Sequence, residues 1–273
     1  MADAILEAKE VSKAYAQHGG VLRRRIGTIL AVDRVSVALR LGETVGLVGE
    51  SGCGKTTLGK LLVGLLVPSR GQVLIRGRSF GRVKGAELLA ARRAVQFVFQ
   101  DPMNSLNPRM SVEETLSEPL IIHRLAGGRI ARHALVEKLL EGVQLPAAFC
   151  GRLPRELSGG ERQRVGIARA LATEPEVLIC DEPIASLDVS VGAQILELLR
   201  GVCRRRRMSL FFISHDLGAV ASLCERIVVM REGRLMETGP TDTLLQRPQQ
   251  SYTELLIRSA ALDLEAAGPS SVG

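Results

Sequence analysis

Aromatic residues and long apolar runs are both scarce in this chain of 273 residues. Phe, Trp and Tyr together make up 3% of it. Proteins that bind single-stranded nucleic acid stack bases on aromatic side chains, so we expect no nucleic-acid partner. No uncharged apolar run reaches the roughly 18 residues that a transmembrane helix needs. The opening stretch MADAILEAKEVSKAY carries charges and lacks the apolar core of a signal peptide. Any work at a membrane is therefore expected to be done from outside the lipid.

Cysteines are few, and their arrangement excludes two common uses. Their number is odd, and no pair has the C-x-x-C spacing, which argues against a disulfide framework or a zinc site and favours a reducing cytosol. The five are Cys53, Cys150, Cys180, Cys203 and Cys224.

The net charge is modest, at +7, and suits an acidic ligand or a membrane surface. Arginines cluster in two basic runs, 23–25 and 204–207. These runs are interpreted either as solvated loops or as patches that favour an anionic membrane surface, and the sequence leaves both alternatives open.

Four short apolar runs are continuous rather than alternating, which indicates strands buried on both faces of a parallel sheet. Helical periodicity lies between them, with apolar stripes in 55–66 and 190–202. Strands that alternate with helices predict an α/β fold whose ligand chemistry lies at the carboxyl ends of the strands. The four runs are TVGLVG (44–49), AVQFVF (94–99), EVLICD (176–181) and SLFFISH (209–215).

The middle of the chain, about 101–165, contains helical patterns and no run typical of a buried strand. We expect a helical subdomain there, inserted into an α/β core that comprises about 1–100 and 166–245. The helical patterns are SVEETLSEPLIIHRL (111–125) and ARHALVEKLLEGVQL (131–145).

The pattern thins after about Thr243, and 246–273 is interpreted as a C-terminal tail that ends in a frayed segment, LEAAGPSSVG. No internal repeat is present, so each motif below occurs once.

A phosphate-binding loop (P-loop, or Walker A motif) lies in GLVGESGCGKTT, directly after a strand and at the start of a helix. Glycines let successive backbone N–H groups converge on phosphate oxygens, and the helix N-terminus adds positive potential. The Lys55 ammonium is expected to reach the β- and γ-phosphates, and the Thr56 hydroxyl to bind Mg²⁺. The expected nucleotide-binding residues are Gly49, Glu50, Ser51, Gly52, Cys53, Gly54, Lys55, Thr56 and Thr57.

A pair of carboxylates ends the run VLICDEP. Asp181 is expected to hold the Mg²⁺ through a bound water. Glu182 points elsewhere because side chains alternate along a strand, and it is placed to position or deprotonate the water that attacks the γ-phosphate. The alternative is that both are a solvated strand end.

Two further polar residues end strands that lead to the same crevice. The imidazole of His215 can hydrogen-bond a γ-phosphate oxygen and so sense that phosphate. The Gln100 amide can meet both Mg²⁺ and the lytic water, while the loop after it moves. Alone, each has a plainer interpretation, as a structural histidine and a surface glutamine.

These motifs, together with LSGGERQR (157–164) and the SLD of 186–188, resemble the nucleotide-binding subunits of ABC transporters in order and spacing over about 5–245. The resemblance implies a RecA-like P-loop NTPase fold, ATP and Mg²⁺ as cofactors, and ATP hydrolysis.

The resemblance also implies a composite site between two subunits. Ser158, Gly159 and Gly160 would bind the γ-phosphate of an ATP held by the P-loop of another subunit. Asp188 would contact the partner subunit, and Tyr15 would stack on adenine. Since one P-loop and one signature are present, the chain supplies half of each of two sites and is expected to form a head-to-tail dimer, with a paralogous ATPase subunit or with itself.

Within that family the chain resembles the oligopeptide, dipeptide and nickel importer branch. The similar segments include FQDPMNSLNPRM, SEPLIIH, a long N-terminal loop QHGGVLRRRIGTILAVD and the C-terminal RPQQSYTELLIRSA. The resemblance implies two permease subunits, a periplasmic or extracellular solute-binding protein, and a peripheral place on the cytoplasmic face of the inner membrane. Peptide import is favoured. Nickel or metal-chelate import, or a non-transport ATPase such as a phosphonate-pathway accessory subunit, remains an alternative.

Overall fold

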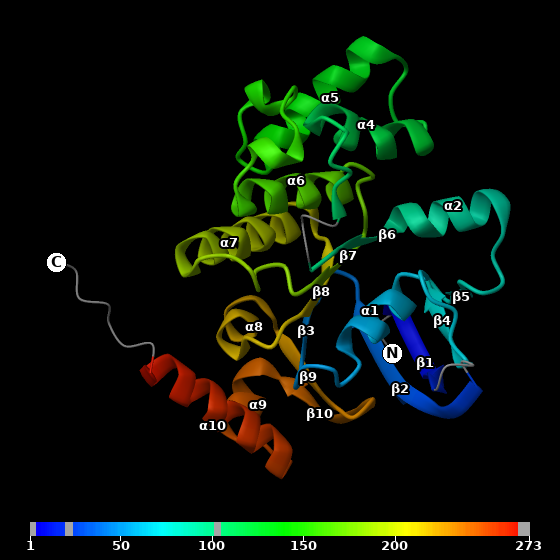
Figure 1. Cartoon of the computed structure of the whole chain (residues 1–273), viewed down its shortest axis with the longest axis vertical. Helices are drawn as coiled ribbons and strands as arrows, with labels where there is room; N and C mark the ends of the chain where they lie inside the picture. Colours follow the sequence, from blue (N-terminus) through cyan, green and yellow to red (C-terminus); the bar gives the residue numbers. More distant parts are fainter. Residues whose placement is uncertain (1–3, 20–23, 101–104, 267–273) are drawn as a thin grey trace.

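Two β-sheets and a group of helices make up the part of the chain that the computed structural model describes, residues 4–19, 24–100 and 105–266. The larger sheet has the strand order β10-β9-β3-β8-β7-β6, and the smaller one has the order β2-β1-β4-β5. Figure 1 shows helices α4, α5 and α6 gathered at one end of the molecule, above the two sheets. The segment directly after Gln100, the tip of the expected N-terminal loop and the last residues of the expected frayed tail lie outside the described residues.

The larger sheet contains the four strands that the apolar runs predict, and these strands are parallel to one another. A fifth parallel strand, β9, pairs with β3, and β10 pairs with β9 in the antiparallel sense at the sheet edge. The α/β fold with a mostly parallel sheet is therefore confirmed. The strands are β3 (Thr44–Val48), β6 (Val95–Val98), β7 (Val177–Asp181), β8 (Ser209–Ile213), β9 (Arg226–Arg231) and β10 (Arg234–Pro240).

Continuous apolar runs form these strands because side chains from both faces of the sheet are buried. Along β7, Leu178 and Cys180 join one hydrophobic cluster, whereas Val177 and Ile179 join the other. All four are 0% exposed. The first cluster lies against the helical end of the molecule, and the second contains residues of helix α1 (Lys55–Leu62) and of the smaller sheet. Two-sided burial leaves no face for polar residues, which accounts for the missing alternation.

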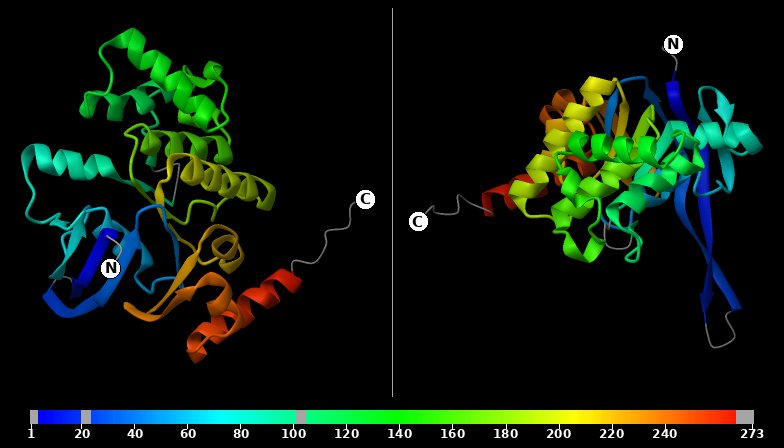
Figure 2. Two further views of the ribbon diagram at one scale, coloured as in Figure 1. Left: turned by 180° about the vertical axis from the view of Figure 1, so that it is seen from behind. Right: turned by 90° about the horizontal axis from the view of Figure 1, so that it is seen from above.

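The smaller, antiparallel sheet covers α1, and the sequence did not predict it. Its two long strands pair from Ala4↔Arg40 out to Gly19↔Arg24 and form a ribbon that extends beyond the body of the molecule (Figure 2). The stretch expected to be a long N-terminal loop is thus mostly strand. The four strands are β1 (Ala4–Gly19), β2 (Arg24–Arg40), β4 (Arg70–Ile75) and β5 (Arg78–Ser79).

The middle of the chain folds into helices, as its patterns predict. Ser111 caps the first of them: its hydroxyl accepts from the N–H of Glu114, while the Glu114 carboxylate accepts from the N–H of Ser111. Helix α6 crosses the boundary expected near residue 165. These helices are α4 (Val112–Ile122), α5 (Arg129–Gly142), the short 3₁₀ turns η1 (Ala147–Phe149) and η2 (Pro154–Glu156), and α6 (Gly159–Leu171).

The remaining helices flank the larger sheet, and the last two of them lie near the C-terminus. They are α2 (Gly85–Ala94), α7 (Val189–Arg206), α8 (Leu217–Leu223), α9 (Thr241–Gln246) and α10 (Ser251–Ala266). The second basic run ends α7, where positive charge is favourable near the helix C-terminus. The tail expected over 246–273 is therefore helical from Ser251 to Ala266, and Tyr252 near its start is buried.

All five cysteines are free and buried. Burial raises the pKa of the Cys203 thiol to about 12. Among the described helices, none combines the length and the apolarity needed to cross a bilayer.

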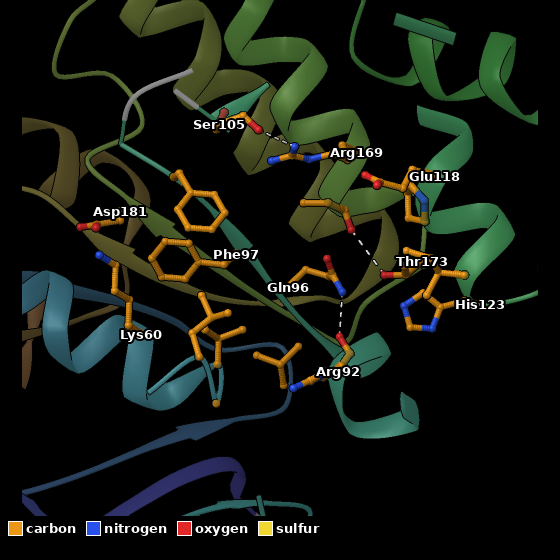
Figure 3. A pocket seen from close by; sticks show the side chains of 18 of the residues that line it. Lys60, Arg92, Gln96, Phe97, Ser105, Glu118, His123, Arg169, Thr173 and Asp181 are labelled. Carbon is orange, nitrogen blue, oxygen red and sulfur yellow. Dashed lines mark hydrogen bonds between the residues drawn. The ribbon is translucent and has the colours of Figure 1, made fainter. Parts of the chain in front are cut away.

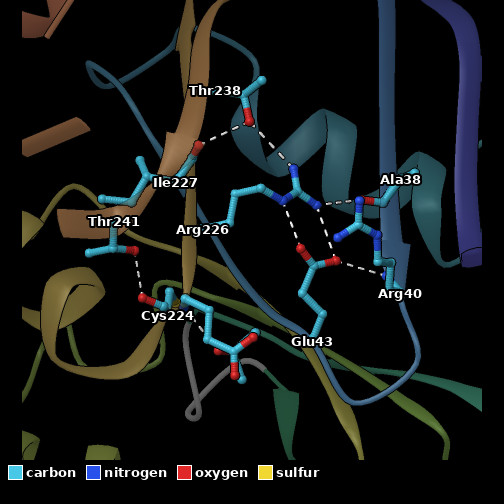
Figure 4. Close-up of polar contacts among 10 residues, drawn as sticks. Ala38, Arg40, Glu43, Cys224, Arg226, Ile227, Thr238 and Thr241 are labelled. Carbon is cyan, nitrogen blue, oxygen red and sulfur yellow. Dashed lines mark hydrogen bonds and ion pairs between the residues drawn. The ribbon is translucent and has the colours of Figure 1, made fainter. Parts of the chain in front are cut away.

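An ion pair between Arg226 and Glu43 joins the two sheets (Figure 4). The Arg226 guanidinium donates to Glu43 Oε1 at 2.7 Å and to the carbonyl of Ala38, on β2, at 2.6 Å. The Arg40 N–H donates to the other carboxylate oxygen. Burial by itself raises the pKa of the Glu43 carboxyl, but the hydrogen bonds from Arg226 and Arg40 outweigh it, and the pKa is lowered.

We predict that Glu43→Gln lowers the free energy of unfolding by about 1–3 kcal/mol near neutral pH, because it removes a charge-assisted hydrogen-bond acceptor. The carboxylate contributes its stability above the unfolded-state pKa of about 4.3 and loses it as the pH falls through the lowered folded-state pKa. Urea unfolding of the two proteins should therefore converge in acid. Glu87→Gln, which removes the exposed partner of Arg78, is the control and should change stability by less than about 0.5 kcal/mol. Equal losses would contradict the role given to Glu43.

Candidate functional site

The phosphate-binding loop runs from β3 to α1 and is clamped by backbone on two sides. Gly49 has a φ of 153° and Gly54 a φ of 108°, in the region that favours glycine. A Cβ at Gly49 would lie 2.1 Å from the Met230 carbonyl oxygen, at the end of β9. A Cβ at Gly54 would lie 2.1 Å from the Ala31 carbonyl oxygen, on β2. Both glycines are thus required by close backbone approach as well as by conformation.

Lys55, the first residue of α1, bridges this loop. Its Nζ donates to the carbonyl oxygen of Gly49 at 2.7 Å and to that of Glu50 at 2.9 Å. The residue is 6% exposed. An ammonium group has three N–H donors, so one is left for an anion in the loop.

Asp181 and Thr56 meet at the end of β7. The Thr56 hydroxyl donates to Asp181 Oδ1 at 3.1 Å, and Asp181 is 2% exposed. Burial raises the pKa of the Asp181 carboxyl; the Thr56 hydrogen bond opposes this and the neighbouring Glu182 adds to it. A desolvated carboxylate of this kind is stabilised by a cation.

The donor set here fits Mg²⁺, which prefers oxygen ligands and usually binds through one or two protein groups plus phosphates and water. A carboxylate, a hydroxyl and, from Gln100, an amide oxygen line one cleft. Over 4–19, 24–100 and 105–266 no group of three His, Cys, Asp or Glu residues is placed to hold a metal by itself.

Glu182 and His215 form the next pair, at the ends of β7 and β8. His215 Nδ1 lies 2.6 Å from Glu182 Oε2. The Glu182 side chain is 10% exposed, whereas that of His215 is 62% exposed. Glu182 has a φ of 49°, and its N–H donates to the Ile213 carbonyl. Left-handed backbone at a non-glycine residue costs roughly 1–2 kcal/mol, and here it turns the carboxylate away from Asp181 toward His215.

A cleft of about 670 Å³ opens beside Thr56 and Asp181, between α1, β6 and the helices α4 and α6. Thr56, Gln100 and Asp181 lie among its lining residues. Figure 3 shows Asp181 and Lys60 at one side of the cleft, and Glu118 and His123 at the other. On the helical side, Arg169 donates to the Ser105 carbonyl at 2.6 Å. Three of the expected site residues are therefore brought together here.

The LSGGERQR segment lies elsewhere, at the N-terminus of α6. Ser158 caps that helix through a capping box with Glu161, and hydrogen bonds to Ser158 lower the pKa of the Glu161 carboxyl. A Cβ at Gly160 would lie 2.5 Å from Val191 Cγ1. Asp188 is exposed at the start of α7, the helix that also carries Val191. None of residues 158–160 is among those that line the cleft.

Tyr15 lies on the ribbon of the smaller sheet and is 40% exposed. It pairs with Ile29, two residues before the Ala31 carbonyl that borders Gly54. Lys13 Nζ lies 5.6 Å from its ring centroid. The exposed ring is therefore carried by the strand pair that adjoins the loop.

Tyr252, on α10, touches the loop and is absent from the sequence-based prediction. Its hydroxyl oxygen accepts from the Glu50 N–H at 3.2 Å. The segment RPQQSYTELL indicated only a resemblance to the importer branch and no contact with the loop. A contact between a hydroxyl and a backbone N–H 202 residues away leaves no local pattern.

Comparisons with known proteins decide the family. A family model described as "ABC transporter" matches residues 32–185, more than half of the chain. This chain belongs to the ABC transporter family. The oligopeptide transport ATP-binding protein AppF of Bacillus subtilis (strain 168) is 42% identical over 94% of this chain and 78% of AppF. OppF of the same organism, also named an oligopeptide transport ATP-binding protein, is 45% identical over 86% of this chain and 78% of OppF.

The fold comparison agrees with that family. A solved dimer of the ATP-binding cassette MJ0796, in a post-hydrolysis state bound to ADP and Pi, matches with a TM-score of 0.77. It is 30% identical and covers 86% of this chain and 98% of its own. The predicted ABC nucleotide-binding fold is thereby confirmed, and the chain is an ABC ATPase.

We predict that Gly54→Ala lowers the free energy of unfolding of the unliganded protein by about 3–5 kcal/mol, since a Cβ would meet the Ala31 carbonyl in addition to straining the backbone. Gly52→Ala is the matched control, because Gly52 also has a positive φ, of 80°, but a Cβ there would meet no atom within 4 Å. That variant should lose only about 1–2 kcal/mol. Thermal or urea unfolding measures both losses. Equal losses would show that the Ala31 carbonyl moves aside for a Cβ at position 54 at no extra cost.

Proposed function

We propose that this chain is the ATP-hydrolysing subunit of an ABC importer for oligopeptides or dipeptides. The observation that carries the proposal is the meeting of a phosphate loop, the Thr56–Asp181 pair and the Glu182–His215 pair at the carboxyl ends of three parallel strands. The substrate class is supported by relatives such as AppF and OppF, which are named for oligopeptide transport.

The triphosphate would bind in the loop of residues 49–57. Its backbone N–H groups and the free N–H of the Lys55 ammonium would donate to phosphate oxygens, as positive loops at helix N-termini do. The exposed Tyr15 ring would stack on adenine, which contributes roughly 1–3 kcal/mol in comparable contacts.

Thr56 and Asp181, with Gln100 beside them, are the residues that would hold Mg²⁺. The ion, when bound, offsets the charge of the triphosphate. Asp181 supplies the buried negative charge that makes the position attractive to a cation, and the Thr56 hydroxyl keeps that carboxylate oriented.

Glu182 would act as the general base. The oxygen of a water attacks the γ-phosphorus, its proton passes to the Glu182 carboxylate, and the bond from the γ-phosphorus to the β–γ bridging oxygen breaks, leaving ADP and phosphate. His215 Nδ1 lies 2.6 Å from the Glu182 carboxylate and orients it. Because most of the His215 side chain is exposed, an imidazolium there, with a hydrogen on both ring nitrogens, would also donate from Nε2 to a γ-phosphate oxygen.

The second half of each ATP site would come from another subunit. Ser158, Gly159 and Gly160 lie at an exposed helix N-terminus outside the cleft, where they would bind the γ-phosphate held by the partner's loop. Asp188 would contact that partner. The partner is a paralogous ATPase or a second copy, in a head-to-tail dimer that works with two permeases and a solute-binding protein at the cytoplasmic face of the membrane. The dimeric arrangement of the similar cassette MJ0796 supports this assembly.

Ser158→Arg should leave ATP binding by the isolated subunit unchanged and reduce hydrolysis by the dimer at least about 100-fold, because one lost anion-stabilising contact costs about that much. Ser111→Arg is the control: Ser111 forms the same capping box with Glu114 at the start of α4. It should keep hydrolysis while losing a similar helix cap. Full hydrolysis by the Ser158 variant would refute the cross-subunit role.

Deletion of the gene should abolish growth on peptides as sole amino-acid source, while growth on limiting nickel is retained. The wild-type chain should restore peptide growth, whereas Glu182→Gln should not, although its ATP-bound dimers should accumulate. Loss of growth only under nickel limitation would overturn the peptide assignment and leave the ATPase assignment intact.

A further inference from the structure

We infer that Tyr252 is a positioning residue of the ATP site: through the Gly49–Glu50 peptide it sets the place of the Lys55 ammonium. The inference rests on the proposal that the loop of residues 49–57 binds the triphosphate. It gives helix α10, which the motifs leave without a role, a part in nucleotide binding.

One peptide group connects Tyr252 with Lys55. The carbonyl oxygen of Gly49 accepts from Lys55 Nζ at 2.7 Å, and the N–H of Glu50 donates to the Tyr252 hydroxyl oxygen at 3.2 Å. The two atoms belong to the same planar unit, on its opposite edges. A rotation of that plane therefore disturbs both hydrogen bonds together, so the tyrosine on one edge restrains the lysine on the other.

Tyr252 is itself held firmly enough to act as a brace. The residue is 5% exposed, and the Arg231 guanidinium lies over its ring, 4.8 Å from the ring centroid. Arg231 is the last residue of β9. It follows Met230, whose carbonyl oxygen lies so close to Gly49 that it leaves no room for a Cβ. The same strand end thus contacts the loop glycine and covers the tyrosine ring.

The start of α10 is tied to the neighbouring strand. The Glu237 carboxylate, on β10, accepts from the N–H groups of Gln249 at 2.8 Å and Gln250 at 3.1 Å, directly before the helix. β10 pairs with β9 in the same sheet as β3. The loop is therefore fixed to the sheet through β3 at its beginning and, in addition, through β10 and α10 at Glu50.

The restraint on the Gly49–Glu50 peptide affects ATP binding because the loop carbonyls determine where the Lys55 ammonium lies. Two of its three donors are used by Gly49 and Glu50, which leaves the third in a fixed direction. A loop held in its binding conformation loses less freedom when the phosphate arrives. Without the tyrosine hydroxyl, the peptide loses one of its restraints, and the direction of the ammonium is less firmly fixed.

Tyr252→Phe in the full-length chain tests this, since it removes the hydroxyl and keeps the ring. We expect the Kd for ATP and for ADP to rise about 2- to 10-fold, the range that one hydrogen bond commands. Hydrogen exchange at the Glu50 amide should speed up by a similar factor. In the working dimer, KM should rise while kcat stays near wild type.

Thr241→Val is the matched control, because it also removes a buried hydroxyl near the C-terminus, one that donates to the Cys224 carbonyl at 2.6 Å. It should lower the Tm without changing the Kd. Should Tyr252→Phe fail to fold, Glu237→Ala, which releases the start of α10, should raise the Kd in the same direction.

The outcomes separate this inference from the proposal on which it rests. If Lys55→Ala weakens binding and Tyr252→Phe does not, the brace is wrong and the phosphate site stands. If Lys55→Ala leaves the Kd unchanged, the phosphate site itself is wrong. If Thr241→Val raises the Kd as much as Tyr252→Phe does, the effect is general destabilisation and the inference is overturned.

Discussion

Parallel pairing of β3, β7 and β8 is the constraint on which the rest of the molecule depends. Leu47 and Asp181 both pair with Ile213, so the three strands end at one level. The phosphate loop, the Asp181–Glu182 pair and His215 follow those ends directly and have to meet. Burial on both faces holds the strands in register, because a slip by one residue would turn every apolar side chain to the wrong cluster. Fold stability and site geometry thus share one cause.

Local patterns in the sequence predicted the four buried strands and the helices of the middle segment, because each pattern lies within a few neighbouring residues. The antiparallel sheet was not predicted. Its two long strands are half exposed and interrupted by register shifts, so the alternation of apolar and polar residues along them is weak. β9 was also missed, although RIVVMR is a continuous apolar run of the kind that identified the others. Residues 251–266 of the expected tail are helical, and Tyr252 is buried against the loop, a contact that no local pattern indicates.

In the candidate site, too, local sequence predicts some features, whereas others are visible only in the structure. Residues adjacent to a strand end, such as Lys55 and Glu182, could be placed from sequence because chain direction alone determines their surroundings. The hydrogen bond between Glu182 and His215, and the left-handed backbone that makes it possible, required coordinates, since the two strands that carry them pair only in the folded state. The contact between the Tyr252 hydroxyl and the Glu50 backbone N–H has no local signature either, because 202 residues separate the two.

The burial of every native thiol has a practical consequence. Maleimide reagents attack accessible thiolates, and these five sulfurs are enclosed by the protein. A cysteine introduced at an exposed position on the α6 or α7 surface would therefore carry a fluorophore or spin label alone, with the native five left in place. Distances between two such labels on different subunits would measure how far apart the subunits lie in the proposed dimer.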